Sequence, residues 1–240
     1  LQNAVFLYVP LLLIMGVIAW IFLRSIPIQA TFKEQLDIFK NKHTWFCTVT
    51  YVMTFGSFSG LAAVFPLLIK GVYGGFPGAP DPLKYAFLGP LIGSVVRVIF
   101  GPVSDKLGGG ILTLISGLGL TLGCLALVFS GMLTPDDLSA FPYFVGLMLT
   151  LFFFSGMGNA STFRQYPIVF SHSPRQAAGV LGWTAAVAAY GPFIFSSLIG
   201  IAIGVSGNST AFFIGWSAFC LIGSVINWWY YARKGCEKPC

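Results

Sequence analysis

The chain has 240 residues, of which 56% are hydrophobic and only 8% are charged, and its mean hydropathy is +0.85. Such a composition excludes a single soluble domain, which would need a polar surface. The net charge of +6 does not indicate nucleic-acid binding, because the basic residues lie in short loops between apolar stretches and there report membrane topology. We therefore expect an all-α membrane protein with several spans, a lipid bilayer around it and no nucleic-acid partner.

Seven apolar segments follow one another along the chain, each close to the roughly 20 residues that a helix needs to cross a bilayer. The first segment stands apart, and the other six form a compact set. We expect a transmembrane helix in the first, a six-helix domain at residues 44–232 and a cytosolic tail at 233–240. The segments are 4–23, 44–70, 84–104, 111–130, 141–170, 177–204 and 210–232.

Residues 24–43 form a polar connection between the first and second segments. Charged residues alternate there with the apolar residues Phe32, Leu36, Ile38 and Phe39. Such a pattern is typical of a short amphipathic helix on the membrane surface, but a solvated connector explains it equally well. Both interpretations make this stretch a loop between domains.

The Lys and Arg residues predict the orientation. Placing residues 24–43 in the cytosol leaves only Lys70 and Lys84 outside, and it puts the end of the chain in the cytosol. We expect a multi-pass protein of the cell (inner) membrane. The basic residues at or near cytosolic ends are then Arg24, Lys33, Lys40, Lys42, Lys106, Arg164, Arg175, Arg233, Lys234 and Lys238.

The first apolar segment is an unusual start. The sequence begins at Leu1 rather than Met, no basic region precedes the segment, and no A-x-A cleavage site follows it. We expect a fragment, a processed chain or one half of a split protein whose earlier spans lie elsewhere.

Arg97 lies inside the otherwise apolar third segment, and no Asp or Glu occurs within any apolar segment. A guanidinium at bilayer depth costs at least about 2.5 to 3.5 kcal/mol, so it normally lines a bundle interior or a wet cavity beside a counter-charge. A mobile anion is therefore a natural candidate partner. The alternative is a structural cation that pairs with a carboxylate outside this chain.

The second to fourth and the fifth to seventh segments share short sequence matches. Phe58-Ser59-Gly60 recurs as Phe154-Ser155-Gly156, and Gly89-Pro90 recurs as Gly191-Pro192. Although Gly and Pro are common in membrane helices, the matches occur in the same order and fit a three-plus-three inverted repeat.

The turn at residues 101–110 reads GPVSDKLGGG. It resembles the G-x-x-x-D-[RK]-x-G-G turn that the major facilitator superfamily carries between the second and third and between the eighth and ninth helices. The resemblance implies that Asp105, with Lys106 beside it, caps a helix end and pairs with neighbouring charges to close the cytosolic side. The alternative is a polar turn without a gating role. If the turn follows helix eight, the chain is the carboxy-terminal half, helices six to twelve, and an amino-terminal half with helices one to five is its partner.

Three further stretches, residues 51–58, 85–97 and 158–163, resemble the nitrate/nitrite porter family. In that family an Arg from each half holds the planar oxyanion, and aromatic residues of helix seven pack against it. The resemblance therefore implies substrate-binding roles for Arg97, Tyr51 and Phe55. Its glycine-rich helix eleven maps on residues 182–192, where Gly182 is retained as a further site residue but Ala and Pro replace other glycines. Asn159 is expected to bond between helices.

The resemblance implies transport of nitrate or nitrite by alternating access. A planar guanidinium can bind two oxygens of such an anion together, which a Lys cannot. Because the apolar segments lack Asp, Glu and His, we expect anion exchange rather than proton symport. The alternatives are a carrier of another small solute and a membrane subunit that keeps the fold without transporting.

An enzyme is not expected, because no nucleophile with a base and no phosphate loop occurs. The five cysteines form no CxxC pair and no His lies at metal-ligand spacing, so we expect no metal and no cofactor. His43 and His172 are in or next to cytosolic loops, where neither is placed to relay protons at mid-membrane.

Overall fold

The computed structural model describes residues 2–24 and 31–240 of the chain, and no β-strand occurs in those two ranges. It has seven helical stretches long and apolar enough to cross a membrane. The prediction of an all-α protein with seven spans is confirmed.

The chain divides into two compact units, residues 1–36 and 37–240. The first unit contains α1 (Gln2–Phe22), which is the first apolar segment, and the short helix α2 (Phe32–Gln35). A capping box starts α2, since Thr31 N–H donates to Glu34 Oε2 at 2.8 Å and Glu34 N–H donates to Thr31 Oγ1 at 3.4 Å. Within residues 24–43, the structure has α2 and a following 3-10 turn, η1 (Leu36–Lys40); whether this stretch lies on a membrane surface or is a solvated connector stays a prediction. Residues 25–30 of that prediction lie outside the described residues.

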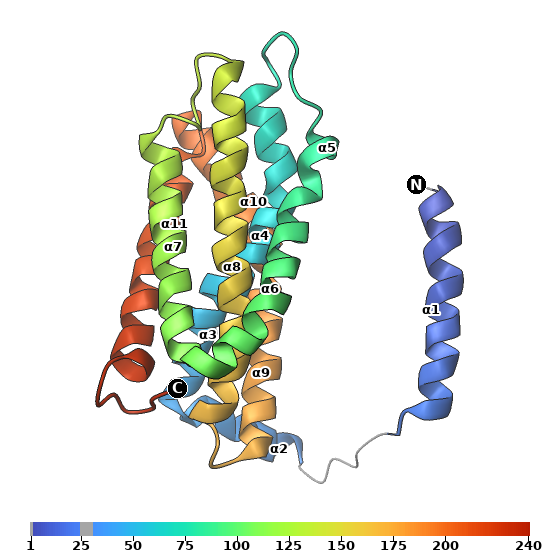
Figure 1. The fold of residues 1–240 in the computed structure, drawn as a ribbon, viewed down its shortest axis with the longest axis vertical. Helices are drawn as coiled ribbons and strands as arrows, with labels where there is room; N and C mark the ends of the chain where they lie inside the picture. Colours follow the sequence, from blue (N-terminus) through green and yellow to red (C-terminus); the bar gives the residue numbers. More distant parts are fainter. Residues whose placement is uncertain (1, 25–30) are drawn as a thin grey trace. The chain divides into compact units, whose positions relative to one another are not determined.

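The second unit is a bundle built from the other six spans (Figure 1). Five of these six spans, all within the described residues, combine more than one helical element. Their elements are α3 (Lys42–Tyr51), η2 (Val52–Gly56), α4 (Ser57–Leu68) and η3 (Ile69–Tyr73) in the second span; α5 (Pro82–Ala86) and α6 (Leu88–Leu107) in the third; α7 (Gly109–Phe129) in the fourth; η4 (Leu138–Ala140) and α8 (Phe141–Val169) in the fifth; α9 (Pro174–Ala188) and α10 (Gly191–Ser206) in the sixth; and α11 (Thr210–Asn227) and η5 (Trp228–Ala232) in the seventh.

Helix α8 occupies the middle of this bundle, packed against α6 and α7, while α7 also packs on α11 and α10 on α4 (Figure 1). Two glycines bring α6 and α8 close together. A Cβ added at Gly156 would lie 2.8 Å from Gly93 Cα and 2.9 Å from its carbonyl carbon. Small residues at helix crossings are the usual means by which membrane helices pack without a hydrophobic driving force. The contact fixes α6, which carries Arg97, against α8.

Two irregularities lie side by side in the bundle. The second span contains a π-helical turn, η2, and the sixth span breaks between Ala188 and Gly191. A Cβ at Gly191 would lie 2.5 Å from Ser59 Oγ and 3.2 Å from the carbonyl carbon of Gly56, so glycine is needed for this approach. Ser59 Oγ donates to the carbonyl oxygen of Ala188 at 3.4 Å, which satisfies one acceptor freed by the break.

Candidate functional site

Arg97 of α6 is an exposed residue, and its guanidinium lies over an aromatic ring of α8. Its Cζ is 5.0 Å from the ring centroid of Phe163, which α8 supplies. This distance is typical of a cation–π contact. None of the Asp and Glu residues described in the structure forms an ion pair with Arg97. A guanidinium stacked in this way keeps its in-plane N–H donors directed outward from the ring.

Tyr51 and Phe55 form the second part of the site. Their rings stack with centroids 5.4 Å apart and planes 18° apart, as the four-residue spacing predicts for one helix face. Tyr51 ends α3, and Phe55 lies within the π-helical turn η2 that follows. Such turns often occur at functional sites, because they widen the helix and re-aim a side chain.

Asn159 holds Tyr51 in place. The Tyr51 hydroxyl donates to Asn159 Oδ1 at 3.2 Å, and both residues are buried. This is a contact between α3 and α8, in agreement with the expectation that Asn159 bonds between helices. A buried hydroxyl without such a partner would be destabilising, so the pair orients the phenol ring.

Phe163 joins these parts, and sequence reasoning assigned it no role. Its ring meets the Tyr51 ring edge to face, with centroids 5.7 Å apart and an interplanar angle of 77°, while Arg97 lies over it. The signal was present, since Phe163 follows Asn159 by four residues and so shares its helix face. The ring of Phe163 therefore contacts Arg97 and Tyr51, and Tyr51 in turn contacts Phe55 and Asn159.

Gly182 is not part of this group. It lies on α9, exposed, with no heavy atom within 4 Å of where a Cβ would be. No contact joins it to Arg97 or Tyr51 among the residues that the structure describes, and its proposed binding role stays a prediction.

Asp105 pairs with a charge on another helix. Arg164 Nε of α8 lies 2.9 Å from Asp105 Oδ1 of α6, an ion pair without the directional geometry of a hydrogen bond. Lys106, the neighbour named with it, is exposed. At the same end of the bundle, Asp37 of η1 pairs with Arg175 at the start of α9, and this hydrogen bond lowers the pKa of Asp37. Ion pairs thus connect neighbouring elements at this end.

The ring of Phe163 supplies a first test of the site. If the chain belongs to a carrier like those that its sequence resembles, we expect Phe163→Leu to reduce anion transport about fivefold, because the guanidinium loses a cation–π contact of about 1 kcal/mol. Initial rates in proteoliposomes would measure the loss. Phe163→Tyr is the matched control, since it keeps the aromatic face; equal rates for the Leu and Tyr variants would contradict the role of the ring.

Within the described ranges, no group of three or more His, Cys, Asp or Glu residues could hold a metal ion. The five cysteines are free thiols. The site is therefore built from one cation, aromatic rings and an amide.

The sequence of this chain is similar to those of several known proteins, over most or all of its length. It is 58% identical to the probable nitrate/nitrite antiporter NarK2 of Thermus thermophilus, over 100% of this chain and 53% of that protein. It is 30% identical to the nitrate/nitrite transporter NarU of Escherichia coli (strain K12), over 98% of this chain and 54% of the relative. It is 23% identical to the nitrite extrusion protein of Bacillus subtilis (strain 168), over 86% of this chain and 49% of the relative.

No protein-family model matches the chain. The chain spans about half the length of the curated relatives it matches. These relatives support the resemblance to the nitrate/nitrite porters, and the helical architecture agrees with an all-α half of a transporter of the major facilitator superfamily. By name, these homologues of the membrane protein are a probable nitrate/nitrite antiporter, a nitrate/nitrite transporter and a nitrite extrusion protein.

Proposed function

We propose that this chain is the carboxy-terminal half, helices six to twelve, of a carrier that moves nitrate and nitrite across the inner membrane by alternating access. The observation that carries the proposal is the guanidinium of Arg97 on the Phe163 ring, next to the Tyr51–Asn159 pair. The coverage of about half of NarK2 and NarU supports the proposal that an amino-terminal half completes the carrier.

The chemistry of the site fits a small planar anion. The planar guanidinium of Arg97 can donate to two oxygens of the anion. The partly exposed ring of Phe55, which stacks on the buried ring of Tyr51, offers a flat surface on which the anion plane can rest. A second Arg from the amino-terminal half would close the site from the other side, as in the family that the sequence resembles. Together, two guanidinium groups would hold the anion plane from both sides.

Anion exchange is the mode of transport that we propose. Asp and Glu are absent from the apolar segments, so this half has no carboxyl group at the depth of Arg97 that could bind and release a proton during transport. The name of the Thermus relative, an antiporter, agrees with this choice. In such a cycle, the carrier would move nitrate across the membrane in one direction. It would then change back to its starting conformation while it moves nitrite in the opposite direction.

Asp105 and its partner Arg164 serve as the gate in this proposal. The pair joins the end of α6 to α8 next to the turn that resembles the superfamily motif. Exposed pairs contribute little stability, about 0 to 1 kcal/mol, so this one can open and close within a transport cycle. With residues 24–43 in the cytosol, the gate faces the cytosol and so does the tail.

Counterflow tests this function. We expect proteoliposomes with the complete transporter to take up nitrate several times faster when loaded with nitrite than when loaded with chloride, because exchange needs a planar oxyanion for the return step and chloride is not one. An imposed proton gradient without internal nitrite should give no such stimulation.

Two results would count against the proposal. Uptake driven by the proton gradient alone would contradict anion exchange and indicate proton symport instead. No nitrate or nitrite movement in any loading condition, with correct insertion, would overturn the substrate.

A further inference from the structure

The chain folds back on itself after η5. Residues 236–240, which we call the strap, return along the end of the seventh span, where Lys238 N–H donates to the carbonyl oxygen of Tyr230 at 3.1 Å and Cys240 N–H donates to that of Tyr231 at 3.4 Å. The strap then reaches a different element, since Gly110 N–H donates to the carbonyl oxygen of Cys240 at 3.1 Å. It thus connects the end of η5 to the turn between α6 and α7.

Gly108 and Gly110, at and just after that turn, form the surface on which the strap packs, which we call its seat. Gly108 has φ +92°, and a Cβ there would lie 2.9 Å from the carbonyl oxygen of Cys240. A Cβ at Gly110 would lie 2.8 Å from the carbonyl oxygen of Tyr231 and 3.0 Å from that of Cys240. Backbone packs here directly on backbone, so any larger residue at Gly110 must displace the strap.

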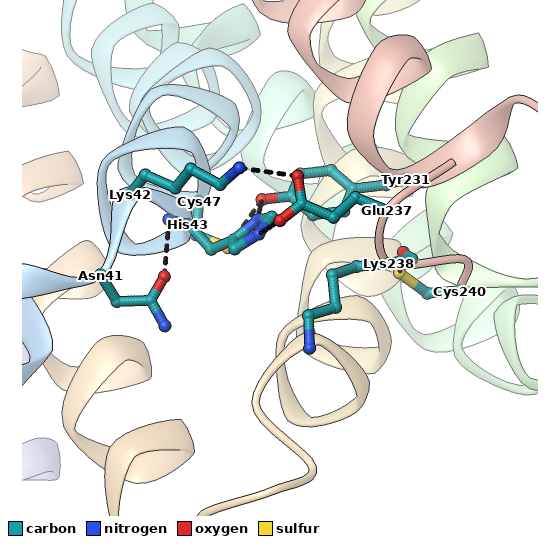
Figure 2. Close-up of polar contacts among 8 residues, drawn as sticks. All are labelled: Asn41, Lys42, His43, Cys47, Tyr231, Glu237, Lys238 and Cys240. Carbon is teal, nitrogen blue, oxygen red and sulfur yellow. Dashed lines mark hydrogen bonds and ion pairs between the residues drawn. The ribbon is translucent and has the colours of Figure 1, made fainter. Parts of the chain in front are cut away.

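Side chains hold the strap from the other direction, at the start of α3 (Figure 2). Lys42 Nζ lies 2.7 Å from Glu237 Oε2, and His43 Nε2 lies 3.1 Å from Glu237 Oε1. The other ring nitrogen, His43 Nδ1, is 2.9 Å from the Tyr231 hydroxyl. Hydrogen bonds from Lys42 and His43 lower the pKa of Glu237 below its usual range, so the carboxylate remains ionised near neutral pH.

His43 is central to this contact and lies at the start of α3, next to the predicted loop. Its side chain is only 4% exposed. A neutral imidazole with its proton on Nε2 satisfies both neighbours, because it donates to Glu237 and accepts from the Tyr231 hydroxyl. Figure 2 shows both partners converging on the ring, while the Lys238 side chain extends away from Glu237.

We propose that the strap is a regulatory latch that controls how freely the carrier changes conformation. It connects the two elements that lead to the candidate site, since α3 ends at Tyr51 and the turn under the strap follows Asp105. Docked, it holds the start of α3 and the α6–α7 turn in fixed positions; released, it lets both shift. The effect on transport rests on the proposed function, but the docking does not.

Cysteine labelling tests the docking, using thiols that the protein already has. Cys236, within the strap, is 9% exposed, whereas Cys124 and Cys220 are buried in the bundle core. In the complete transporter, Glu237→Gln should speed maleimide labelling of Cys236 and Cys240 about two- to fivefold, because it removes an exposed ion pair. Gly110→Ala should speed it about tenfold, because the strap no longer fits its seat. Mass spectrometry would quantify each thiol separately.

Two matched variants control for charge and for the added methyl group. Asp136→Asn removes a carboxylate at the opposite end of the bundle, and Gly215→Ala adds a methyl group where no atom lies within 4 Å. Neither should change labelling. Slow labelling of Cys124 and Cys220 in all variants shows that the core remains folded, and wild-type labelling of Cys236 in both strap variants would overturn the docking.

The same variants, assayed for counterflow, test the regulation. We expect Glu237→Gln and Gly110→Ala to change the maximal exchange rate at least about twofold, in proportion to the labelling of the strap. Faster labelling with an unchanged rate would refute a regulatory role. A wild-type protein that docks its strap but moves no nitrate would refute the proposed function and leave the docking intact.

Discussion

Replacing Arg97 by Lys in the complete transporter should abolish nitrate and nitrite uptake. A Lys keeps the positive charge but offers a point charge in place of the planar fork, and it loses the flat contact with the ring of Phe163. Charge-assisted hydrogen bonds contribute about 1.5 to 3 kcal/mol each, so losing the paired contact predicts a fall of about 100-fold in uptake. Initial rates in proteoliposomes, normalised to inserted protein, measure it.

Arg233→Lys is the control for this substitution. Arg233 also stacks on an aromatic ring, with its Cζ 4.1 Å from the Trp229 centroid, but it lies after the seventh span and away from the site. We expect it to transport at the wild-type rate. Normal uptake by the Arg97→Lys variant, with correct insertion, would refute the binding role and leave a structural cation as the explanation.

Gly156→Ala should destabilise the bundle and impair transport together. The added methyl group would be pushed against the backbone of Gly93, which has no flexible atoms to move away. Overpacking of this kind costs about 1 to 3 kcal/mol. Because Gly93 precedes Arg97 by one helical turn on the same face, forcing α6 away from α8 also separates the guanidinium from Phe163.

The measurement is the fraction of monodisperse protein that remains after heating in detergent, alongside the exchange rate. Gly146→Ala on the same helix is the matched control, since no atom lies within 4 Å of its Cβ position and Ala favours a helix over Gly. The two variants should differ clearly in both assays. If Gly156→Ala behaves like Gly146→Ala, the crossing of α6 and α8 has more freedom than its geometry indicates.

Much of the fold follows from hydropathy, because bilayer thickness sets the length of each span. The seven predicted segments match the seven helical stretches. Hydropathy does not indicate where a helix is interrupted. Gly191-Pro192 was interpreted as one half of a repeat, whereas the structure has the sixth span break there, and whether the halves are related by an inverted repeat stays a prediction.

The candidate site was predictable in part. A charge in an apolar segment identifies Arg97, and a family motif points to Tyr51, Phe55 and Asn159. The structure places Phe55 and Asn159 against Tyr51, and Phe163 between Tyr51 and Arg97. The role of the ring itself depends on how α6 and α8 cross, which no local pattern encodes. The contact between His43 and Glu237 could not be predicted from local sequence patterns, because 194 residues separate the two partners.

The π-helical turn η2 sets the two parts of the second span out of phase with each other. A π-helical turn holds one residue more than an α-helical turn, and each residue advances an α-helix by about 100°. The face that α4 presents to α10 is therefore rotated by about that angle from the one a helical wheel through α3 would assign. Because of this one additional residue, Tyr51 points toward Asn159 while Ser59, in the same span, points toward the break at Ala188. In an unbroken α-helix, the directions of these two side chains would not suit both contacts.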